Sequence, residues 1–333
     1  MDMIALAATG AVVAITAALS YLGGRWLSAA AAPLGFVDEP SSRGMHRHPI
    51  PRAGGVAVGA ALAVGTALLA VPGWRPDAGV AAIAAGVVWA VGVADDRWRM
   101  PARWRFVAQL AAVAVVAMVL PVALPGPAWA WQILAVIGWV WSVNAHNFMD
   151  GIDAIAAVQA VTVFAGMAML TALHGHGAAP WLVVAAAYAG FAVLNWPPAR
   201  LFLGDGGSTL LGYLVGLGTA SAVLQASTTA YGWFILSAVF FTDATWTLVV
   251  RVATGQCWYR PHRLHAYQKL ALRWGSHGRV SAAVALVNLA WLLPLALLAV
   301  ASPHWGPMVC VLAYAPLFAI AWRCRAGWPE AGT

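Results

Sequence analysis

Long apolar runs recur along almost the entire 333-residue chain and constrain its fold more than any other feature. A helix of about 20 apolar residues is long enough to cross the hydrocarbon core of a membrane. The sequence therefore predicts an all-α polytopic integral membrane protein, built as a bundle of about 11 transmembrane helices. The eleven segments run roughly over residues 3–22, 53–72, 79–94, 106–124, 127–143, 154–173, 179–194, 208–226, 230–250, 280–301 and 305–322.

Charged residues are scarce outside the connections between these segments. They make up 9% of the chain, whereas soluble domains carry about 25%. Because eleven spans leave no room for a separate soluble domain, we expect a single membrane domain over residues 1–333. The first segment lacks a preceding basic region, so we interpret it as a retained helix and not as a secretory signal.

The basic residues indicate the orientation of the bundle. With eleven spans, 17 of the 18 Lys and Arg residues fall on one side, in the odd-numbered loops and the C-terminal tail, and only Arg75 lies opposite. The positive-inside rule makes the basic side cytoplasmic and puts the N-terminus outside. Binding of nucleic acid is not expected, because the chain has no basic soluble module.

Two adjacent acids, Asp95 and Asp96, end the third segment. Carboxylates at a helix C-terminus oppose the helix dipole, and adjacent ones repel each other. They are either solvated boundary residues neutralised by Arg97 and Arg99, or a pair that binds a cation or takes up a proton.

The fifth loop carries polar side chains at intervals of three residues: Asn144, Asn147, Asp150 and Asp153. This spacing predicts a polar ridge along one helical face. Such a ridge at the end of a membrane helix needs a partner, which could be a metal ion, a nucleotide or the arginines of neighbouring loops. The alternative is a cluster that only caps the helix.

A glycine-rich motif, Phe202–Ser208, opens the eighth segment after a proline pair has ended the seventh. Glycine lets the backbone approach a ligand closely, and a helix start offers free amides to an anion. Asp205 could hold Mg²⁺ against a phosphate there. Asp205 and Ser208 could instead simply cap the helix.

The ninth loop is the longest and most basic, with the run Arg260–Lys269. Arginine and histidine bind phosphate through charge-assisted hydrogen bonds, although a basic patch that contacts lipid headgroups is the alternative. In the ninth span, Asp243 either pairs with Arg251 or faces a polar cavity. Acids, glycines and basic side chains on one membrane face together favour phosphoryl transfer.

Five ordered motifs then carry a resemblance over about residues 35–280. They are the block His46–Gly55, the pair Asp95-Asp96, the Asn-x-x-Asn-x-x-Asp-Gly-x-Asp run from Asn144, the Phe-x-Gly-Asp-x-Gly-Ser run from Phe202, and the basic loop at 261–268. Together they resemble the polyprenyl-phosphate N-acetylhexosamine-1-phosphate transferases, which include the WecA-like and MraY-like enzymes.

The resemblance implies transfer of an N-acetylhexosamine-1-phosphate from a UDP-sugar to undecaprenyl phosphate, with release of UMP and Mg²⁺ as cofactor. It implies Asp95, Asp96 and Asp205 as catalytic residues, the first two toward the lipid phosphate, and Asp205 and Asp150 as metal ligands. Substrate-binding roles are implied for Arg47, Asn144, Asn147, Asp150, Asp153, Phe202, Arg263 and His265.

The basic loop departs from the WecA-like pattern, because Tyr267 and Gln268 stand in place of two histidines. The form His-Ala-Tyr-Gln resembles the WbpL-like subgroup, which begins O-antigen synthesis with 6-deoxy-N-acetylhexosamines such as N-acetylfucosamine or N-acetylquinovosamine. It differs from the triple histidine of the muramoyl-pentapeptide enzymes.

The resemblance also implies a bacterial inner membrane location with the active site on the cytoplasmic face, and a homodimer is a candidate assembly. The alternatives that remain are a UDP-GlcNAc-specific enzyme of the WecA type, a membrane transporter and an inactive scaffold of a glycan-assembly complex. The acids cluster at helix ends and not at the membrane midplane, which argues against transport.

Overall fold

A computed structural model describes residues 3–30, 33–39, 48–70, 76–175, 177–257, 259–260 and 262–329. The described chain is almost entirely helical, with one two-stranded antiparallel sheet of β1 and β2. The elements are α1 (Met3–Ala30), β1 (Val37–Asp38), β2 (Ile50–Pro51), α2 (Gly54–Ala70), α3 (Pro76–Trp98), α4 (Ala102–Val119), α5 (Ala128–Phe148), α6 (Ile155–Leu173), α7 (Ala179–Asn195), α8 (Gly204–Leu224), α9 (Thr229–Leu236), α10 (Ala238–Ala253), α11 (Ala266–Trp274), α12 (His277–Val287), the π-helix η1 (Asn288–Leu292), α13 (Leu293–Ala301), the short 3₁₀ turn η2 (Pro303–Trp305) and α14 (Gly306–Arg323).

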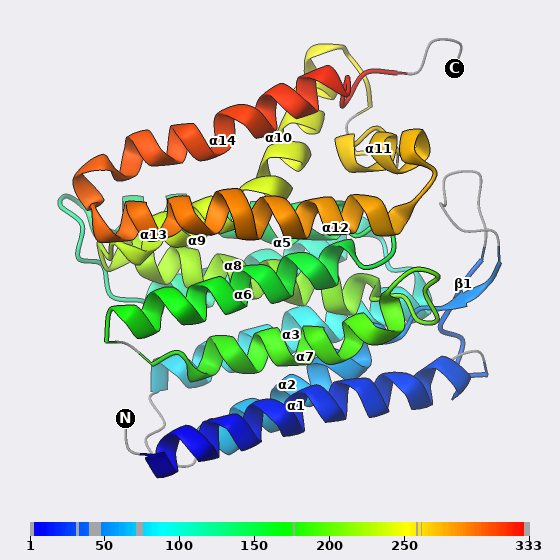
Figure 1. The fold of residues 1–333 in the computed structure, drawn as a ribbon, viewed down its shortest axis with the longest axis horizontal. Coiled ribbons are helices and arrows are strands. Elements are labelled where there is room, and N and C mark those ends of the chain that lie inside the picture. Colours follow the sequence, from blue (N-terminus) through cyan, green and yellow to red (C-terminus); the bar gives the residue numbers. More distant parts are fainter. Residues whose placement is uncertain are drawn as a thin grey trace.

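The all-α polytopic prediction is confirmed, but the number of eleven spans is not. Each predicted segment coincides with a helix or a helix pair, and the helices run roughly side by side (Figure 1). In the described residues, seven helices are long and apolar enough to cross a membrane, or eight if α9 and α10, bent by 60°, form one span. Two more apolar helices, α2 and α7, are shorter.

Helix α8 lies at the centre of the bundle and packs against α2, α3, α5 and α9. Its first ten residues, from Gly204 to Tyr213, are all buried. Glycines on its neighbours let the backbones touch: a Cβ added at Gly92 of α3 would lie 2.6 Å from the carbonyl oxygen of Asp205, and one at Gly55 of α2 would lie 2.2 Å from the amide nitrogen of Gly207. The start of α8 is therefore held between helix backbones and not between long side chains.

This packing predicts a sharp difference between two glycines of α3. Gly92→Ala should lower the melting temperature of the detergent-solubilised protein by several degrees, because forcing a methyl group into a packed contact costs about 1–3 kcal/mol. Gly86→Ala is the matched control, since nothing lies within 4 Å of its added Cβ. Equal melting temperatures for the two variants would contradict the close packing of α3 on α8.

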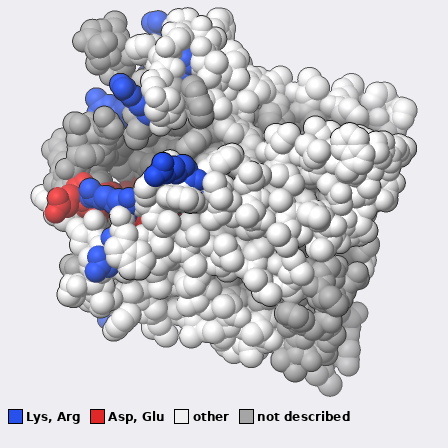
Figure 2. Space-filling view, turned by 180° about the vertical axis from the view of Figure 1, so that it is seen from behind, with Lys and Arg blue, Asp and Glu red and all other residues white. Residues whose placement is uncertain are grey.

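One end of the bundle gathers the sheet, α11 and the C-terminal segment, at the right of Figure 1. There the chain after β2 is tied to the chain before α8: the Phe202 amide donates to the Pro51 carbonyl at 2.8 Å, and the Gly54 amide donates to the Phe202 carbonyl at 2.9 Å. Lys, Arg, Asp and Glu side chains cluster at this end, whereas the described residues over the rest of this face are uncharged (Figure 2). Any polar chemistry of the protein is therefore expected at this end.

Candidate active site

The first turn of α8 is capped by a side chain from another helix. Asp96, near the end of α3, accepts the Asp205 amide on Oδ1 at 2.8 Å and the Gly206 amide on Oδ2 at 2.9 Å. A carboxylate in this position satisfies free amides of a helix start and interacts favourably with the helix dipole. Gly204, with φ of +76°, is needed here because an added Cβ would lie 2.5 Å from Asp96 Oδ2. Asp96 thus holds α3 and α8 together.

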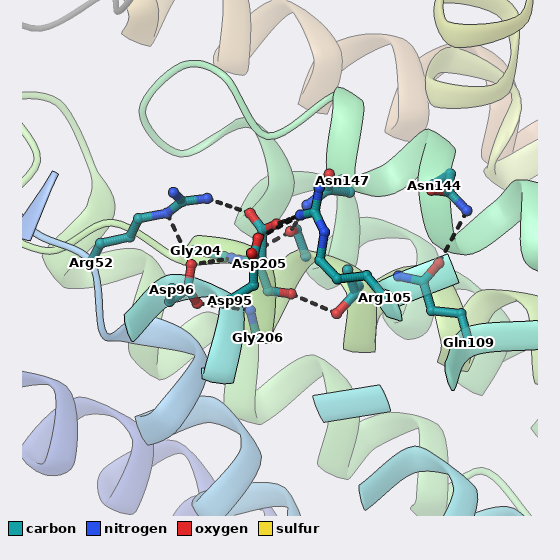
Figure 3. A network of polar contacts seen from close by, with 12 residues as sticks. Arg52, Asp95, Asp96, Arg105, Gln109, Asn144, Asn147, Gly204, Asp205 and Gly206 are labelled. Carbon is teal, nitrogen blue, oxygen red and sulfur yellow. Dashed lines mark hydrogen bonds and ion pairs between the residues drawn. The ribbon is translucent and has the colours of Figure 1, made fainter. Parts of the chain in front are cut away.

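Two arginines bind the Asp205 carboxylate, one on each oxygen (Figure 3). Arg52 bonds Oδ1 through Nη2 and also reaches Asp96, with 3.0 Å from Nε to Oδ1. Arg105 bonds Asp205 Oδ2 at 2.6 Å and Asp95 Oδ2 at 2.5 Å, both through Nη1. The result is a chain of alternating charges that runs from Asp96 through Arg52, Asp205 and Arg105 to Asp95.

This acid–arginine cluster can both hold a cation and bind an anion. Three carboxylates and two guanidinium groups leave one net negative charge when all are ionised. Guanidinium groups carry several N–H donors, so the same arginines can turn toward phosphate oxygens. The carboxylates of Asp96 and Asp205 are buried, and buried charges persist only where each one is paired, which explains the alternation.

Arg52 and Arg105 are the two members that the sequence analysis did not single out. Arg52 lies within the block His46–Gly55, and Arg105 is one of several basic residues near the third loop. A signal for Arg105 exists in the sequence: it stands at the start of a long apolar stretch, where a charge is costly unless a partner is near. Nothing in the sequence alone links Arg52 to Asp205, which is 153 residues away.

Asn144 and Asn147 lie near the end of α5, as predicted. Asn147 donates to the Ser208 hydroxyl of α8 at 3.0 Å, and Asn144 donates to Gln109 of α4 at 3.3 Å. Their amides thus connect α5 to the two helices that carry Asp205 and Arg105. The predicted continuous ridge is wrong, because α5 ends at Phe148, before the two acids of the run.

Asp150 follows the end of α5 and lies near the acid–arginine cluster. Burial raises the pKa of Asp150 to about 7; Arg52 opposes the rise, while Asp205 and Asp96 add to it. In the described part of the chain no hydrogen bond reaches its carboxylate. The Asp150 carboxylate therefore lies close to Arg52, Asp96 and Asp205 but accepts no hydrogen bond from a described residue.

Asp153 lies in a different environment. Its carboxylate pairs with His277 at 3.2 Å and accepts the Ala199 amide at 3.1 Å, while its carbonyl accepts the Ser281 hydroxyl at 2.8 Å. These contacts join the start of α6 to the start of α12 and to the loop before α8. Its substrate-binding role stays a prediction, and the contacts described here are structural.

Two further predicted residues flank the cluster. Phe202 is half-buried beside the 51–54 backbone, two residues before the start of α8. Arg47 lies outside the described residues, together with the first part of its motif.

The basic loop leads into α11, and Asp243 holds the start of that helix instead of pairing with Arg251. Asp243 accepts the Ala266 and Tyr267 amides, each at 2.9 Å, and contacts His265 Nδ1 at 3.2 Å. Arg251 instead donates to loop carbonyls, among them Cys257 at 2.6 Å. The two interpretations of Asp243 are thereby replaced by a third, in which it caps α11.

Helix α11 in turn contacts the segment that carries Asp150. The Tyr267 hydroxyl donates to the Phe148 carbonyl at 3.1 Å. A Cβ at Gly151 would lie 2.2 Å from that hydroxyl, so glycine is required for this approach. His265 is thus brought to the same side of the bundle as Asp150, whereas Arg263 lies in the half-buried loop before α11.

Comparison with known proteins identifies the family. The model of glycosyl transferase family 4 matches residues 78–249, slightly more than half of the chain. The chain belongs to glycosyl transferase family 4. The matched stretch contains Asp95, Asp96, Arg105, Asp150 and Asp205, so the family match covers most of the acid–arginine cluster.

Two relatives of this family 4 glycosyl transferase match most of its length. A decaprenyl-phosphate N-acetylglucosaminephosphotransferase of Mycolicibacterium smegmatis is 28% identical over 81% of the chain and 77% of the relative. A probable undecaprenyl-phosphate N-acetylglucosaminyl 1-phosphate transferase of Bacillus subtilis is 27% identical over 76% of the chain and 74% of the relative. A phospho-N-acetylmuramoyl-pentapeptide-transferase of Gloeothece citriformis matches only 37% of the chain, at 33% identity.

The residues of this glycosyl transferase fit a magnesium ion. No group of three or more His, Cys, Asp and Glu side chains suited to a metal occurs among the described residues. Mg²⁺, however, is usually held by one or two carboxylates together with substrate phosphates and water. Asp150 offers carboxylate oxygens without a donor close to Asp205, and a cation there would offset the burial that raises its pKa. Asp150 and Asp205 are therefore the candidate ligands.

Proposed function

We propose that this chain transfers an N-acetylhexosamine-1-phosphate from a UDP-sugar to undecaprenyl phosphate, with release of UMP. The observation that carries the proposal is the acid–arginine cluster at the start of α8, with the unpaired Asp150 beside it. The names of the mycobacterial and Bacillus relatives support the same reaction class. Two negatively charged substrates must meet, so cationic groups that offset their repulsion are the first requirement.

The reaction is a substitution at phosphorus. A phosphate oxygen of the lipid attacks the sugar-linked phosphorus of the UDP-sugar. The bond from that phosphorus to the bridging oxygen breaks, and UMP leaves with the oxygen and its electron pair. The diphosphate of the product thus contains one phosphate from each substrate, and no covalent enzyme intermediate is needed.

Each member of the cluster has a role that follows from its contacts. Arg52 and Arg105 bind the Asp205 carboxylate and can each turn an N–H toward a phosphate oxygen. Asp95 shares Arg105 with Asp205, and its role in this proposal is to orient the lipid phosphate or to take up its proton. Mg²⁺, held by Asp205 and Asp150 when bound, would neutralise charge that develops on the diphosphate.

The location follows from the distribution of charge. The charged end of the bundle meets the cytosol, according to the positive-inside rule, and the bacterial relatives favour the inner membrane of a bacterium. A polyprenol phosphate keeps its headgroup at that surface while its chain stays in the bilayer. The nucleotide sugar then approaches from the cytosol, and the product begins a surface polysaccharide such as O-antigen.

The sugar is an N-acetylhexosamine. Names of the relatives favour N-acetylglucosamine. The His-Ala-Tyr-Gln run of the basic loop favours a 6-deoxy sugar, because it resembles the WbpL-like subgroup. Discrimination against a single hydroxyl depends on whether the pocket offers that hydroxyl a hydrogen bond.

The test is UMP release by the purified protein in detergent with undecaprenyl phosphate and Mg²⁺. UDP-GlcNAc, UDP-N-acetylfucosamine and UDP-N-acetylquinovosamine are compared as donors. Release that requires both the lipid and the metal is the expected result, and the preferred donor identifies the sugar. No release with any donor from folded protein would count against the proposal and favour a scaffold role.

The two adjacent acids should respond differently to substitution. Asp96→Asn should mainly lower stability, by about 1 kcal/mol as for other lost caps, because both Asp96 oxygens bind the start of α8. Asp95→Asn should leave the melting temperature nearly unchanged and reduce kcat by about 100-fold, as expected for loss of a group that acts in proton transfer. The check is to measure melting temperature and turnover for both variants. The reverse pattern would assign the lipid phosphate to Asp96.

A further inference from the structure

The position of Asp150 is set by the backbone around it and not by a partner of its own side chain. In the described part of the chain its carboxylate accepts no hydrogen bond, and its amide donates to the Asn147 carbonyl at 3.3 Å. Helix α5 has already ended at Phe148. A carboxylate without a donor is oriented by the chain that carries it, so the contacts that fix residues 148–151 also fix Asp150.

Tyr267, at the start of α11 (Figure 1), makes these contacts. Its hydroxyl donates to the Phe148 carbonyl at 3.1 Å. Its ring belongs to the same buried apolar cluster as Met149 and Ile152. A Cβ at Gly151 would lie 2.2 Å from the hydroxyl, so the tyrosine and the 148–151 turn fit together only when residue 151 is glycine. The turn therefore rests on this one side chain.

Tyr267 is itself held in one place. Its amide donates to Asp243 Oδ2 at 2.9 Å, and its ring stacks on His265 with a centroid distance of 5.6 Å. Burial raises the pKa of the Tyr267 hydroxyl well above its usual value, and the charges of Asp243 and Asp150 add to the rise. A hydrogen bond with the Gly151 backbone opposes this rise. The hydroxyl therefore stays protonated and remains a donor near the Asp150 charge.

We propose that Tyr267 is a positioning residue that fixes the 148–151 turn and so holds the Asp150 carboxylate near Asp205, where the two acids bind Mg²⁺ together. This inference rests on the proposed function. In this role the tyrosine touches neither the metal nor a substrate. It acts through the backbone that carries Asp150, as the outer partners of metal ligands do.

This role gives a task to the two residues that stand in place of histidines in the basic loop. The Tyr267 hydroxyl is bonded to the Phe148 carbonyl, and Gln268 Oε1 accepts the His265 amide at 3.3 Å in the cap of α11. Both side chains are buried. They therefore build the start of α11 and its contact with the turn that carries Asp150.

The first test removes one hydroxyl from each of two buried tyrosines in the full-length protein. Tyr267→Phe should raise the Mg²⁺ concentration for half-maximal UMP release about 10-fold, as for loss of an outer partner of a metal ligand. Tyr213→Phe is the matched control, because its buried hydroxyl also donates to a backbone carbonyl, that of Ala81, at 2.9 Å. Both variants should melt at similar temperatures, since each loses one hydrogen bond, but Tyr213→Phe should keep the wild-type Mg²⁺ requirement. Equal Mg²⁺ requirements for the two variants would overturn the proposal.

The second test uses the close fit between Tyr267 and Gly151. Gly151→Ala should lower kcat/KM by about 100-fold, because the methyl group meets the hydroxyl and displaces the turn. Without the hydroxyl, the nearest side-chain atoms to that methyl group are Gln268 Nε2 at 3.1 Å and Tyr267 Cζ at 3.2 Å, which small shifts accommodate. The variant that combines Gly151→Ala with Tyr267→Phe should therefore be about 10-fold more active than Gly151→Ala alone. Losses that multiply in the double variant would overturn the proposal.

A third readout does not depend on turnover. Amide hydrogen exchange, followed by mass spectrometry in detergent, should be about 10-fold faster for residues 148–152 in Tyr267→Phe than in the wild type. Residues 204–210, at the start of α8, should keep their rate. Unchanged exchange at 148–152 would overturn the proposal whether or not the protein is active. Faster exchange in Tyr267→Phe, together with a wild type that shows no turnover, would count against the proposed function alone.

Discussion

Asp205→Asn should abolish sugar-phosphate transfer, with a fall in kcat of about 1,000-fold or more, the upper range for loss of one electrostatic group in an active site. The substitution removes the carboxylate that both Arg52 and Arg105 bind, and one of the two candidate magnesium ligands. It leaves the backbone amide that Asp96 caps, so α8 should still start at the same residue. The measurement is UMP release under single-turnover conditions.

Glu39→Gln is the control for this variant, because it makes the same change from carboxylate to amide at an exposed site. It should be as active as the wild type. Near-normal turnover of Asp205→Asn, in protein with a wild-type melting temperature, would remove Asp205 from the reaction. Such a result would also exclude Asp205 as a required ligand of Mg²⁺.

Arg105→Ala should reduce kcat/KM by about 100-fold, since one preorganised donor to a developing charge contributes about that much. Its guanidinium bridges Asp95 and Asp205, and its loss leaves those two carboxylates facing each other without a cation between them. Arg105→Lys should recover only part of the activity, because an ammonium group lacks the planar fork that can bind two oxygens at once. The two variants are to be compared at saturating lipid.

Arg103→Ala provides the comparison on the same helix. Arg103 is exposed and stacks over the Trp104 ring, outside the acid–arginine cluster. Removing it should leave turnover unchanged. Equal losses for Arg103→Ala and Arg105→Ala would mean that only the general positive charge of this end matters, and that the bridge does not.

Much of the fold could be predicted because a long run of apolar residues indicates a membrane helix. The segments around α6, α7 and α14 were placed within a few residues of their observed ends. The start of α8 was also predictable, since a glycine-rich motif after a proline pair allows few alternatives. The number of spans was harder to predict, because a short or bent apolar helix looks like a full membrane span in the sequence.

The site was predictable as a set of residues but not as a set of contacts. Asp95 and Asp96 are neighbours in sequence, yet one shares Arg105 with Asp205 and the other caps α8. Asp153 fits the three-residue spacing, but the chain leaves the helix before it and turns the carboxylate toward His277. The partner of each carboxylate depends on which other helix packs against its own. The periodicity of one segment does not predict that packing.

The glycine contacts around α8 have a consequence for redesign of the donor specificity. Because α2 and α3 already touch the backbone of α8, the spacing of these three helices is fixed. A modest tilt of one helix cannot widen the site there. A bulkier or smaller sugar is therefore better accommodated by changes outside these packed helices, in the connections at 149–154 and 262–265. Libraries that aim at a new sugar should therefore vary those two stretches and leave Gly55, Gly92 and Gly207 untouched.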